Sequence, residues 1–432
     1  MRMQKDHLPM DTIGMHARLT CLEICHIIMK NQSEVIMLLE PNSNDNKDSI
    51  SKSLEPDTLM NKIEKAYSDL FPSARWSSVR EVLASDENSA DFIRWVLKDE
   101  DYREVDSSNP MYEFAKIRAR HSVITFFIGL VFINCFEFFE SIKTAFEFKS
   151  EPGMVIHLWM LTSLYHDWAY YSTDLRNPDL DYRRITSYYL LEDVAAPNIN
   201  DLSIFIDYAR THSEALAYTY KEIEAYDDYA RKKLHPRFPE DHELLDHGIL
   251  GGVKIFDRLV RRQVKRRNND EDYSSKEYEQ DLLNAKASCL TIAQHNIFKS
   301  SSTSDDVKYG SELTKLHSTS NFVISINTPL LLLLSLVDTF ECVKVFSKSN
   351  NTNGSLRAST VLEKISVIVN LDSVIADFSK LSEYINNQNP ALINKLDHHI
   401  EQVCILNKWT AFTAIEEEDY SVRITMRSNI VN

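Results

Sequence analysis

The hydrophobic positions divide the chain into one long central block and two flanking regions. From residue 111 to residue 346, apolar residues recur at helical spacing in a run of long segments. Polar stretches near 266–281 and 299–321 interrupt this run, as surface insertions between core helices typically do. The pattern predicts a domain of packed helices over residues 111–346.

Shorter amphipathic segments precede the central block. The stretches LMNKIEKAYSDLF and ADFIRWVLKDE have helical spacing, and the polar segment 41–57 separates them from an apolar stretch nearer the N-terminus. Residue types that bind metals do not gather in this part of the sequence. We interpret residues 1–110 as an accessory helical region, and as the part through which an oligomer or a complex with a protein partner would form.

The C-terminal residues 358–432 show shorter patterns. The segment that begins at residue 357 is expected to form a strand or a short helix, followed by a helix. Two alternating runs in WTAFTAIEEEDYSVRITM flank an acidic turn and predict a β-hairpin. We therefore expect a mainly α-helical protein that carries a small C-terminal α/β appendage.

The composition agrees with a helical protein and limits the classes of molecule that it is expected to bind. Hydrophobic residues make up 43% of the 432 residues, which suffices for a large core, and only 8 residues are glycine. The formal net charge of −16 disfavours binding to duplex nucleic acid through general basic charge. A small anionic substrate remains compatible with this charge, because a metal ion or a local basic cluster reverses the field at one site.

We expect neither a membrane span nor a secreted protein. The most apolar stretch, VITFFIGLVFINCFEFF, is shorter than the roughly 20 residues that a transmembrane helix needs, and Asn134 and Glu137 interrupt it. The first residues lack the apolar core of a signal peptide. The 6 cysteines form no CxxC pair, and Cys135, Cys289 and Cys342 lie in apolar runs, which favours a reducing cytoplasm.

Five apolar helical segments of the central block carry residues that bind metals. LTSLYHDWAYYS places His166 directly before Asp167, where two polar side chains raise the free energy of folding unless they are satisfied. The other four segments contribute one residue each, namely His121, His247, His295 and Asp338. Asp338 shares an apolar helical face with Leu331 and Leu334. Four imidazoles and two carboxylates indicate a common metal centre, and this ligand set suits iron, manganese, zinc, cobalt or nickel.

Each of these residues also has a simpler interpretation. A single buried histidine is more often a hydrogen-bonded core residue than a metal ligand, and Lys344 or Arg258 would suffice to pair with Asp338. The metal interpretation is favoured by the joint occurrence of six such residues, in order, on successive apolar helices.

The order His … His-Asp … His … His … Asp resembles that of the HD-domain superfamily of metal-dependent phosphohydrolases. The local sequences YHDWAY, DHGILGG, TIAQHNI and LLSLVDTFE carry the resemblance, which covers residues 111–346. The resemblance implies a helical bundle with two divalent transition-metal ions. The residues that it assigns to the first ion are His121, His166, Asp167 and Asp338.

The resemblance also implies a mechanism. Asp167 would bridge the first ion to a second one held by His247 and His295. A hydroxide shared between the two ions would attack a phosphate ester, so Asp167 is the residue assigned to catalysis. The expected substrate is a small anionic, phosphorylated molecule, for example a nucleotide.

The residues after the His-Asp pair depart from the better-known members of the superfamily. Trp168 and Ala169 stand where cyclic-dinucleotide phosphodiesterases and CRISPR-associated nucleases usually have Gly-Lys, and the GYP motif is absent. The resemblance therefore does not identify the substrate. Three basic residues near the ligand segments are candidate substrate contacts, namely Arg118, Lys254 and Arg258.

Other functions use the same ligands. Inositol-oxygenase-type proteins have the same six-ligand order around a redox-active di-iron pair. A signalling or interaction module stabilised by metal would keep the ligands and hydrolyse nothing. A nuclease that acts on single strands is disfavoured by the net charge of −16, unless the basic run 254–267 forms a groove.

Overall fold

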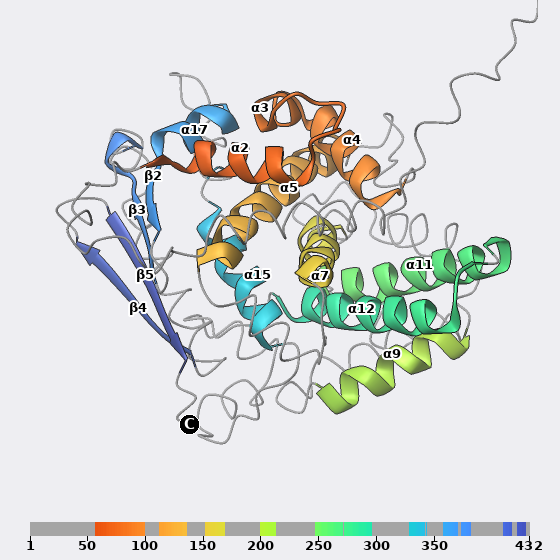
Figure 1. The fold of residues 1–432 in the computed structure, drawn as a ribbon. Coiled ribbons are helices and arrows are strands. Elements are labelled where there is room, and N and C mark those ends of the chain that lie inside the picture. Colours follow the sequence, from red (N-terminus) through yellow and green to blue (C-terminus); the bar gives the residue numbers. More distant parts are fainter. Residues whose placement is uncertain are drawn as a thin grey trace, which may run out of the picture.

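The computed structural model describes most of the predicted helical block and part of both flanking regions. The described residues are 57–99, 112–135, 152–168, 199–212, 247–270, 272–295, 328–341, 343, 357–369, 373–381, 409–416 and 421–428. Helices account for most of them, so the prediction of a mainly α-helical protein is confirmed (Figure 1). Residues 1–56, the first half of the expected accessory region, lie outside the described part.

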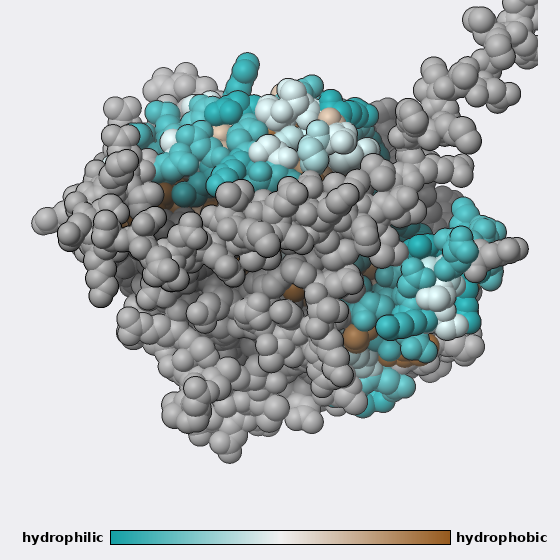
Figure 2. Space-filling model, in the orientation of Figure 1, coloured by the Kyte–Doolittle hydropathy of each residue, from teal (hydrophilic) through white to brown (hydrophobic). Residues whose placement is uncertain are grey.

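Long helices form the body of the molecule. They are α2 (Leu59–Leu70), α4 (Asp86–Leu97), α5 (Tyr112–Cys135), α7 (Pro152–Tyr165), α9 (Ile199–His212), α11 (His247–Asn269), α12 (Ser275–Gln294) and α15 (Thr328–Phe340). Two shorter helices are α3 (Val79–Val82) and α17 (Ala358–Lys364). The described surface over α2, α4, α11 and α12 is mostly hydrophilic in the space-filling view (Figure 2), because these helices turn their apolar residues inward.

The helix α5 is the centre of the core. Every residue from His121 to Ile133 is buried, and α2, α4, α7 and α15 all pack against it. A helix that is apolar on all sides needs neighbours all round, so the interpretation of this stretch as a buried core helix is confirmed for residues 121–133. Among the described helices, none has the length and hydropathy that a membrane span requires.

Residues 57–99 share the hydrophobic core of the central block. Phe92 of α4 packs against Phe127 of α5, with ring centroids 5.7 Å apart, and Phe71, which follows α2, packs against Phe126 at 6.2 Å. Leu59 and Val96 belong to the same cluster of buried side chains. The half of the expected accessory region that the structure describes is therefore in direct contact with the helix that carries His121.

The strands form one antiparallel sheet in the order β1-β2-β3-β5-β4, which lies on the side of the molecule opposite α11 and α12 (Figure 1). Its strands are β1 (Asp57–Thr58), β2 (Ser366–Val369), β3 (Ser373–Asp377), β4 (Trp409–Glu416) and β5 (Ser421–Ser428). Trp409 pairs with Ser428 and Glu416 with Ser421, so the predicted β-hairpin is confirmed.

One expectation for the C-terminal region was wrong. Residues 366–369 form β2 and residues 373–377 form β3, where a helix was expected after the first short element. In β3, Val374 and Ala376 are buried whereas Ile375 and Asp377 are partly exposed, which is the alternation of a strand with one face on the core. The β-branched residues of SVIV and SVIAD favour the same conformation. The strand conformation is also stabilised by the pairing of β3 with β5, a strand of the C-terminal hairpin that is distant in the sequence.

A close contact fixes how α5 and α7 lie against each other. Gly129 of α5 faces the indole of Trp159, and a Cβ atom at Gly129 would overlap with the atoms Cζ2 and Cε2 of that ring. The indole Nε1 donates a hydrogen bond of 2.9 Å to the carbonyl oxygen of Phe126. Since His121 lies on α5 and His166 directly follows α7, this contact also sets the spacing of two predicted metal ligands.

The substitution Gly129→Ala is expected to destabilise the fold. Overpacking of a tight core typically costs about 1–3 kcal/mol, which outweighs the roughly 1 kcal/mol by which alanine is preferred over glycine in a helix. Chemical denaturation measures the difference. In the double variant with Trp159→Phe, the smaller ring makes room for the methyl group, so the two losses should be less than additive. Strict additivity, or a Gly129→Ala variant as stable as wild type, would contradict this contact.

Candidate metal centre

Four helices bring five of the predicted metal ligands to one place. His121 lies in α5 and Asp338 in α15, whereas His166 and Asp167 directly follow α7 and His295 directly follows α12. Two groups of ligand atoms result, and within each group all atoms lie within 4.8 Å of one another. His121, His166 and Asp338 form the first group, and His166, Asp167 and His295 form the second.

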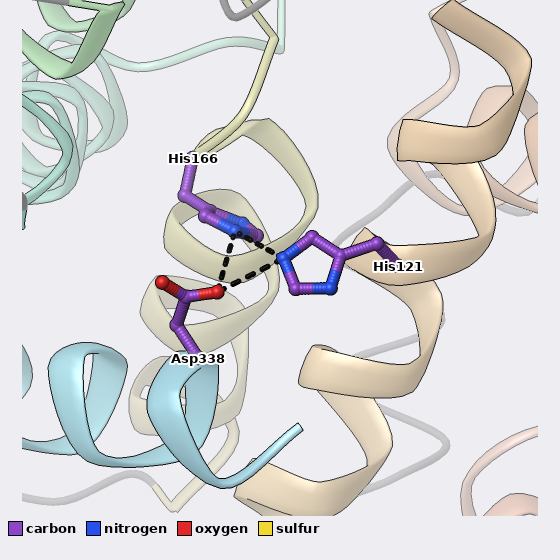
Figure 3. Close-up of side chains that lie close together, drawn as sticks. All are labelled: His121, His166 and Asp338. Atoms are coloured by element: carbon purple, nitrogen blue, oxygen red, sulfur yellow. Dashed lines mark hydrogen bonds and ion pairs between the residues drawn. The ribbon is translucent and has the colours of Figure 1, made fainter. Parts of the chain in front are cut away.

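The first group converges closely. The Nε2 atom of His121 lies 3.2 Å from the Nε2 atom of His166 and 2.9 Å from Oδ1 of Asp338. The distance from His166 Nε2 to Asp338 Oδ1 is 3.8 Å. Figure 3 shows the three side chains directed toward a common point from three different elements.

The carboxylate of Asp167, which belongs to the second group, also lies close to ligands of the first. Its Oδ2 is 3.5 Å from Nε2 of His121 and 3.7 Å from Nε2 of His166. Its Oδ1 faces the other way and lies 3.9 Å from Nε2 of His295. The two oxygens therefore face different imidazoles, which is the arrangement that a bridging carboxylate requires.

Backbone carbonyl groups set the tautomer of two of the histidines. The Nδ1 atom of His166 donates to the carbonyl oxygen of Ser163 at 2.6 Å, and the Nδ1 atom of His295 donates to that of Ile292 at 2.7 Å. A carbonyl oxygen only accepts, so the proton of each neutral ring is on Nδ1. Both rings then direct the lone pair of Nε2 into the centre.

A buried glutamate does the same for the third histidine. The Nδ1 atom of His121 donates to Oε2 of Glu341 at 2.7 Å, and Glu341 is only 1% exposed. Histidines that bind metals commonly donate their other ring N–H to a carboxylate, which fixes the ring and raises its basicity. The sequence analysis missed Glu341. The signal for it is the spacing Asp338-x-x-Glu341 at the end of an apolar helix, which puts a second carboxylate about one turn after the first.

The converging lone pairs and carboxylates of the centre are suited to a bound cation. The Nε2 atoms of His121 and His166 lie 3.2 Å apart, and each of the three Nε2 atoms has an oxygen of Asp167 or Asp338 at 2.9 to 3.9 Å. Lone pairs that meet in a buried region repel each other, because no solvent screens them. A proton on Nε2 of His121 would relieve the contacts of that atom but not the contact between His295 and Asp167, whereas divalent ions would relieve both sets. Neutral imidazoles with carboxylates are a suitable donor set for a divalent transition metal.

One predicted substrate contact touches the centre directly. Arg118 lies one helical turn before His121, and its Nη1 donates to Oδ2 of Asp167 at 2.8 Å. The side chain of Arg118 is 11% exposed, so its charge is largely shielded from solvent. The guanidinium group partly neutralises the carboxylate of Asp167 and helps to hold it in position.

The other two predicted substrate contacts lie on α11 and have protein neighbours. Lys254 is buried, with its Nζ 5.5 Å from the ring centroid of Trp168. Arg258 binds the carboxylate of Asp99. Their roles in binding substrate stay predictions. His247 is the first residue of α11, but its side chain is outside the described part, so its role as a ligand also stays a prediction.

We found no match to the chain among family models, curated proteins or solved structures. The resemblance to the HD-domain superfamily therefore depends on the order of the ligands and on their local sequences.

The contact between Glu341 and His121 yields a test of the centre. The substitution Glu341→Gln keeps the size of the side chain but removes its charge, so the basicity of His121 should fall. We expect metal affinity to decrease by about 10- to 100-fold, measured by competition with a chelator. The exposed Glu363, which pairs with Arg80 at 2.9 Å, provides the control variant Glu363→Gln. Equal affinity in both variants would show that Glu341 does not support the centre.

Proposed function

We propose that the chain is a metal-dependent hydrolase that acts on phosphate esters. The observation that carries the proposal is the convergence of five side chains on one centre, four of them buried and Asp338 partly exposed, namely His121, His166, Asp167, His295 and Asp338. Two divalent transition-metal ions bound there would supply Lewis acidity and would lower the pKa of a water molecule toward neutrality. Hydrolysis of a phosphoryl group is the reaction that this chemistry serves most directly.

The residues of the centre have distinct roles in this proposal. His121, His166 and Asp338 would hold one ion, and His295 would hold the other together with the predicted ligand His247. Asp167 joins the two positions, because its Oδ2 faces His121 and His166 while its Oδ1 faces His295. The hydrogen bonds at Nδ1 keep the rings in the tautomer that binds a metal through Nε2.

The charges around the centre support an anionic substrate. Among the described residues at the centre, the carboxylates of Asp167, Asp338 and Glu341 outnumber the guanidinium group of Arg118. Two divalent ions would reverse the sign of this charge, so a loaded centre would attract an anion. The planar guanidinium group of Arg118 also matches the geometry of phosphate oxygens. Both features favour a phosphorylated substrate over a neutral one.

A small substrate fits the surface charge better than a nucleic-acid strand. The basic run 254–267 is the part of the chain most suited to a nucleic-acid groove, but the described structure engages much of its charge. Arg261 pairs with Asp257 at 2.8 Å, and Arg266 pairs with Asp270 at 3.3 Å. Together with the net charge of −16, these pairs favour a nucleotide or another small phosphate ester.

The proposal includes a compartment. Cys289 is a free thiol inside the core, and burial raises its pKa well above the usual range, so it is an unreactive core residue. Together with the absence of a CxxC pair in the sequence, this favours a reducing cytoplasm.

Binding of a protein partner through residues 1–110 stays a prediction that applies best to residues 1–56, since residues 57–99 pack into the core.

Asp167→Asn tests the proposed activity. Wild type loaded with manganese or iron is assayed against nucleotides, cyclic nucleotides and a chromogenic phosphodiester. We expect hydrolysis of at least one of them, and a loss of about 100-fold or more in Asp167→Asn, since the bridging carboxylate is removed. Asp207, with a side chain that is 72% exposed on α9, provides the control variant Asp207→Asn.

Two outcomes of the same assay would replace the proposal. Metal-loaded wild type that hydrolyses none of these compounds would favour a metal-stabilised interaction module. Consumption of dioxygen by the iron-loaded protein, without hydrolysis, would favour an oxygenase of the inositol-oxygenase type.

A further inference from the structure

A buried polar network lies next to the His166–Asp167 pair. Asp99 follows the end of α4 and is 3% exposed. Its Oδ2 accepts a hydrogen bond of 2.5 Å from the hydroxyl group of Tyr165. Tyr165 is fully buried and is the last residue of α7, directly before His166. The network therefore connects the end of α4 to the first residue of the ligand pair.

The helix α11 holds Asp99 in place. Arg258 donates to both oxygens of the Asp99 carboxylate, through Nε to Oδ2 at 2.8 Å and through Nη2 to Oδ1. Arg262, one turn further along, donates through Nη2 to the carbonyl oxygens of Leu97 and Lys98, both at 2.8 Å. These bonds fix the carboxylate and also the backbone that precedes it.

The protonation states strengthen the contact between Asp99 and Tyr165. Burial by itself raises the pKa of Asp99, but the hydrogen bonds and charges of Arg258, with smaller contributions from Tyr165 and Arg262, outweigh it and lower the pKa. The hydroxyl group of Tyr165 thus donates to an ionised carboxylate, which is a charge-assisted bond roughly twice as strong as a neutral one.

The helix α11 supports both ends of the turn that carries the ligands, through Asp99 at Tyr165 and directly at Trp168. The N–H group of Trp168 donates to the carbonyl oxygen of Tyr165 at 2.9 Å, which closes the turn around His166 and Asp167. Arg258 holds Tyr165 through Asp99. Lys254, one turn earlier on α11, lies with its Nζ 5.5 Å from the ring centroid of Trp168. A shift of Tyr165 would therefore move both ligands together.

We propose that Asp99 is a positioning residue of the metal centre, which sets the location of His166 and Asp167 through the hydroxyl group of Tyr165. This inference rests on the metal centre of the proposed function. It gives the segment 57–99 a part in metal binding, although that segment supplies no ligand among the described residues. It also gives Arg258 and Lys254 a role that requires no contact with substrate.

A second network in the molecule provides the matched control. The hydroxyl group of Tyr273 donates to Oδ2 of Asp281 at 2.7 Å, and Nη1 of Arg266 lies 3.8 Å from the same oxygen. The residue types are the same as at Asp99, although the side chain of Asp281 is 28% exposed. This network lies where α11 and α12 are connected, at the end of α12 opposite to His295. Loss of the tyrosine hydroxyl there should affect stability without moving a ligand.

The test compares Tyr165→Phe, Asp99→Asn and Tyr273→Phe in the full chain. Manganese affinity is measured by competition with a chelator, and thermal unfolding of the metal-free proteins gives their stability. Phenylalanine keeps the packing of the tyrosine ring, so Tyr165→Phe removes the bond to Asp99 alone. We expect manganese affinity to fall by about tenfold or more in Tyr165→Phe and Asp99→Asn. It should stay within about twofold of wild type in Tyr273→Phe, because only the network around Asp99 positions metal ligands.

The outcomes separate this inference from the proposed function. Unchanged manganese affinity in Tyr165→Phe and Asp99→Asn, or an equal loss in Tyr273→Phe, would overturn the positioning role. Wild type that binds none of manganese, iron and zinc would overturn the positioning role and the proposed function together. Wild type that binds manganese with the expected losses in the variants, and yet hydrolyses no phosphate ester, would contradict the proposed function alone.

Discussion

Repulsion between buried lone pairs is the constraint on which the candidate centre depends. Three buried imidazole groups and the buried carboxylate of Asp167 lie close together, next to the carboxylate of Asp338, whose side chain is 24% exposed. Such a group is unfavourable unless a cation lies within it. The hydrogen bonds on the far side of each ring make this worse, because they hold Nδ1 protonated and direct the remaining lone pair inward. The free energy of folding therefore holds together groups that repel one another, and a bound metal ion would remove this repulsion.

The surrounding fold supplies that energy through rigid contacts. The indole of Trp159 against Gly129 fixes α5 to α7 and thereby fixes His121 relative to His166. Glu341, at the end of α15, holds the ring of His121. The network around Asp99 adds a connection from α4 and α11 to the turn that carries the His-Asp pair. The centre is therefore supported by elements that are distant from one another in the sequence.

Local pattern sufficed for the helices and for most of the ligands. Helical periodicity and β-branched alternation are properties of short segments, so the mainly α-helical fold and the C-terminal hairpin could be predicted. Ligands such as His121 stand out because a polar residue type interrupts an apolar face. Asp99 gives no such signal, since its neighbours in LKDED are charged and are typical of an exposed helix end. Its burial, like the pairing of β2 with β3, depends on which elements meet in three dimensions, and the sequence around it does not contain that information.

The metal content of the purified full-length chain tests the metal centre most directly. Because the carboxylate of Asp167 joins the two proposed ion positions, elemental analysis by mass spectrometry should find close to two transition-metal ions per folded wild-type chain and almost none in Asp167→Ala. Circular dichroism would establish that both proteins are folded. A folded wild-type chain without bound transition metal, after exposure to manganese, iron and zinc, would contradict the metal centre and with it the proposed hydrolase.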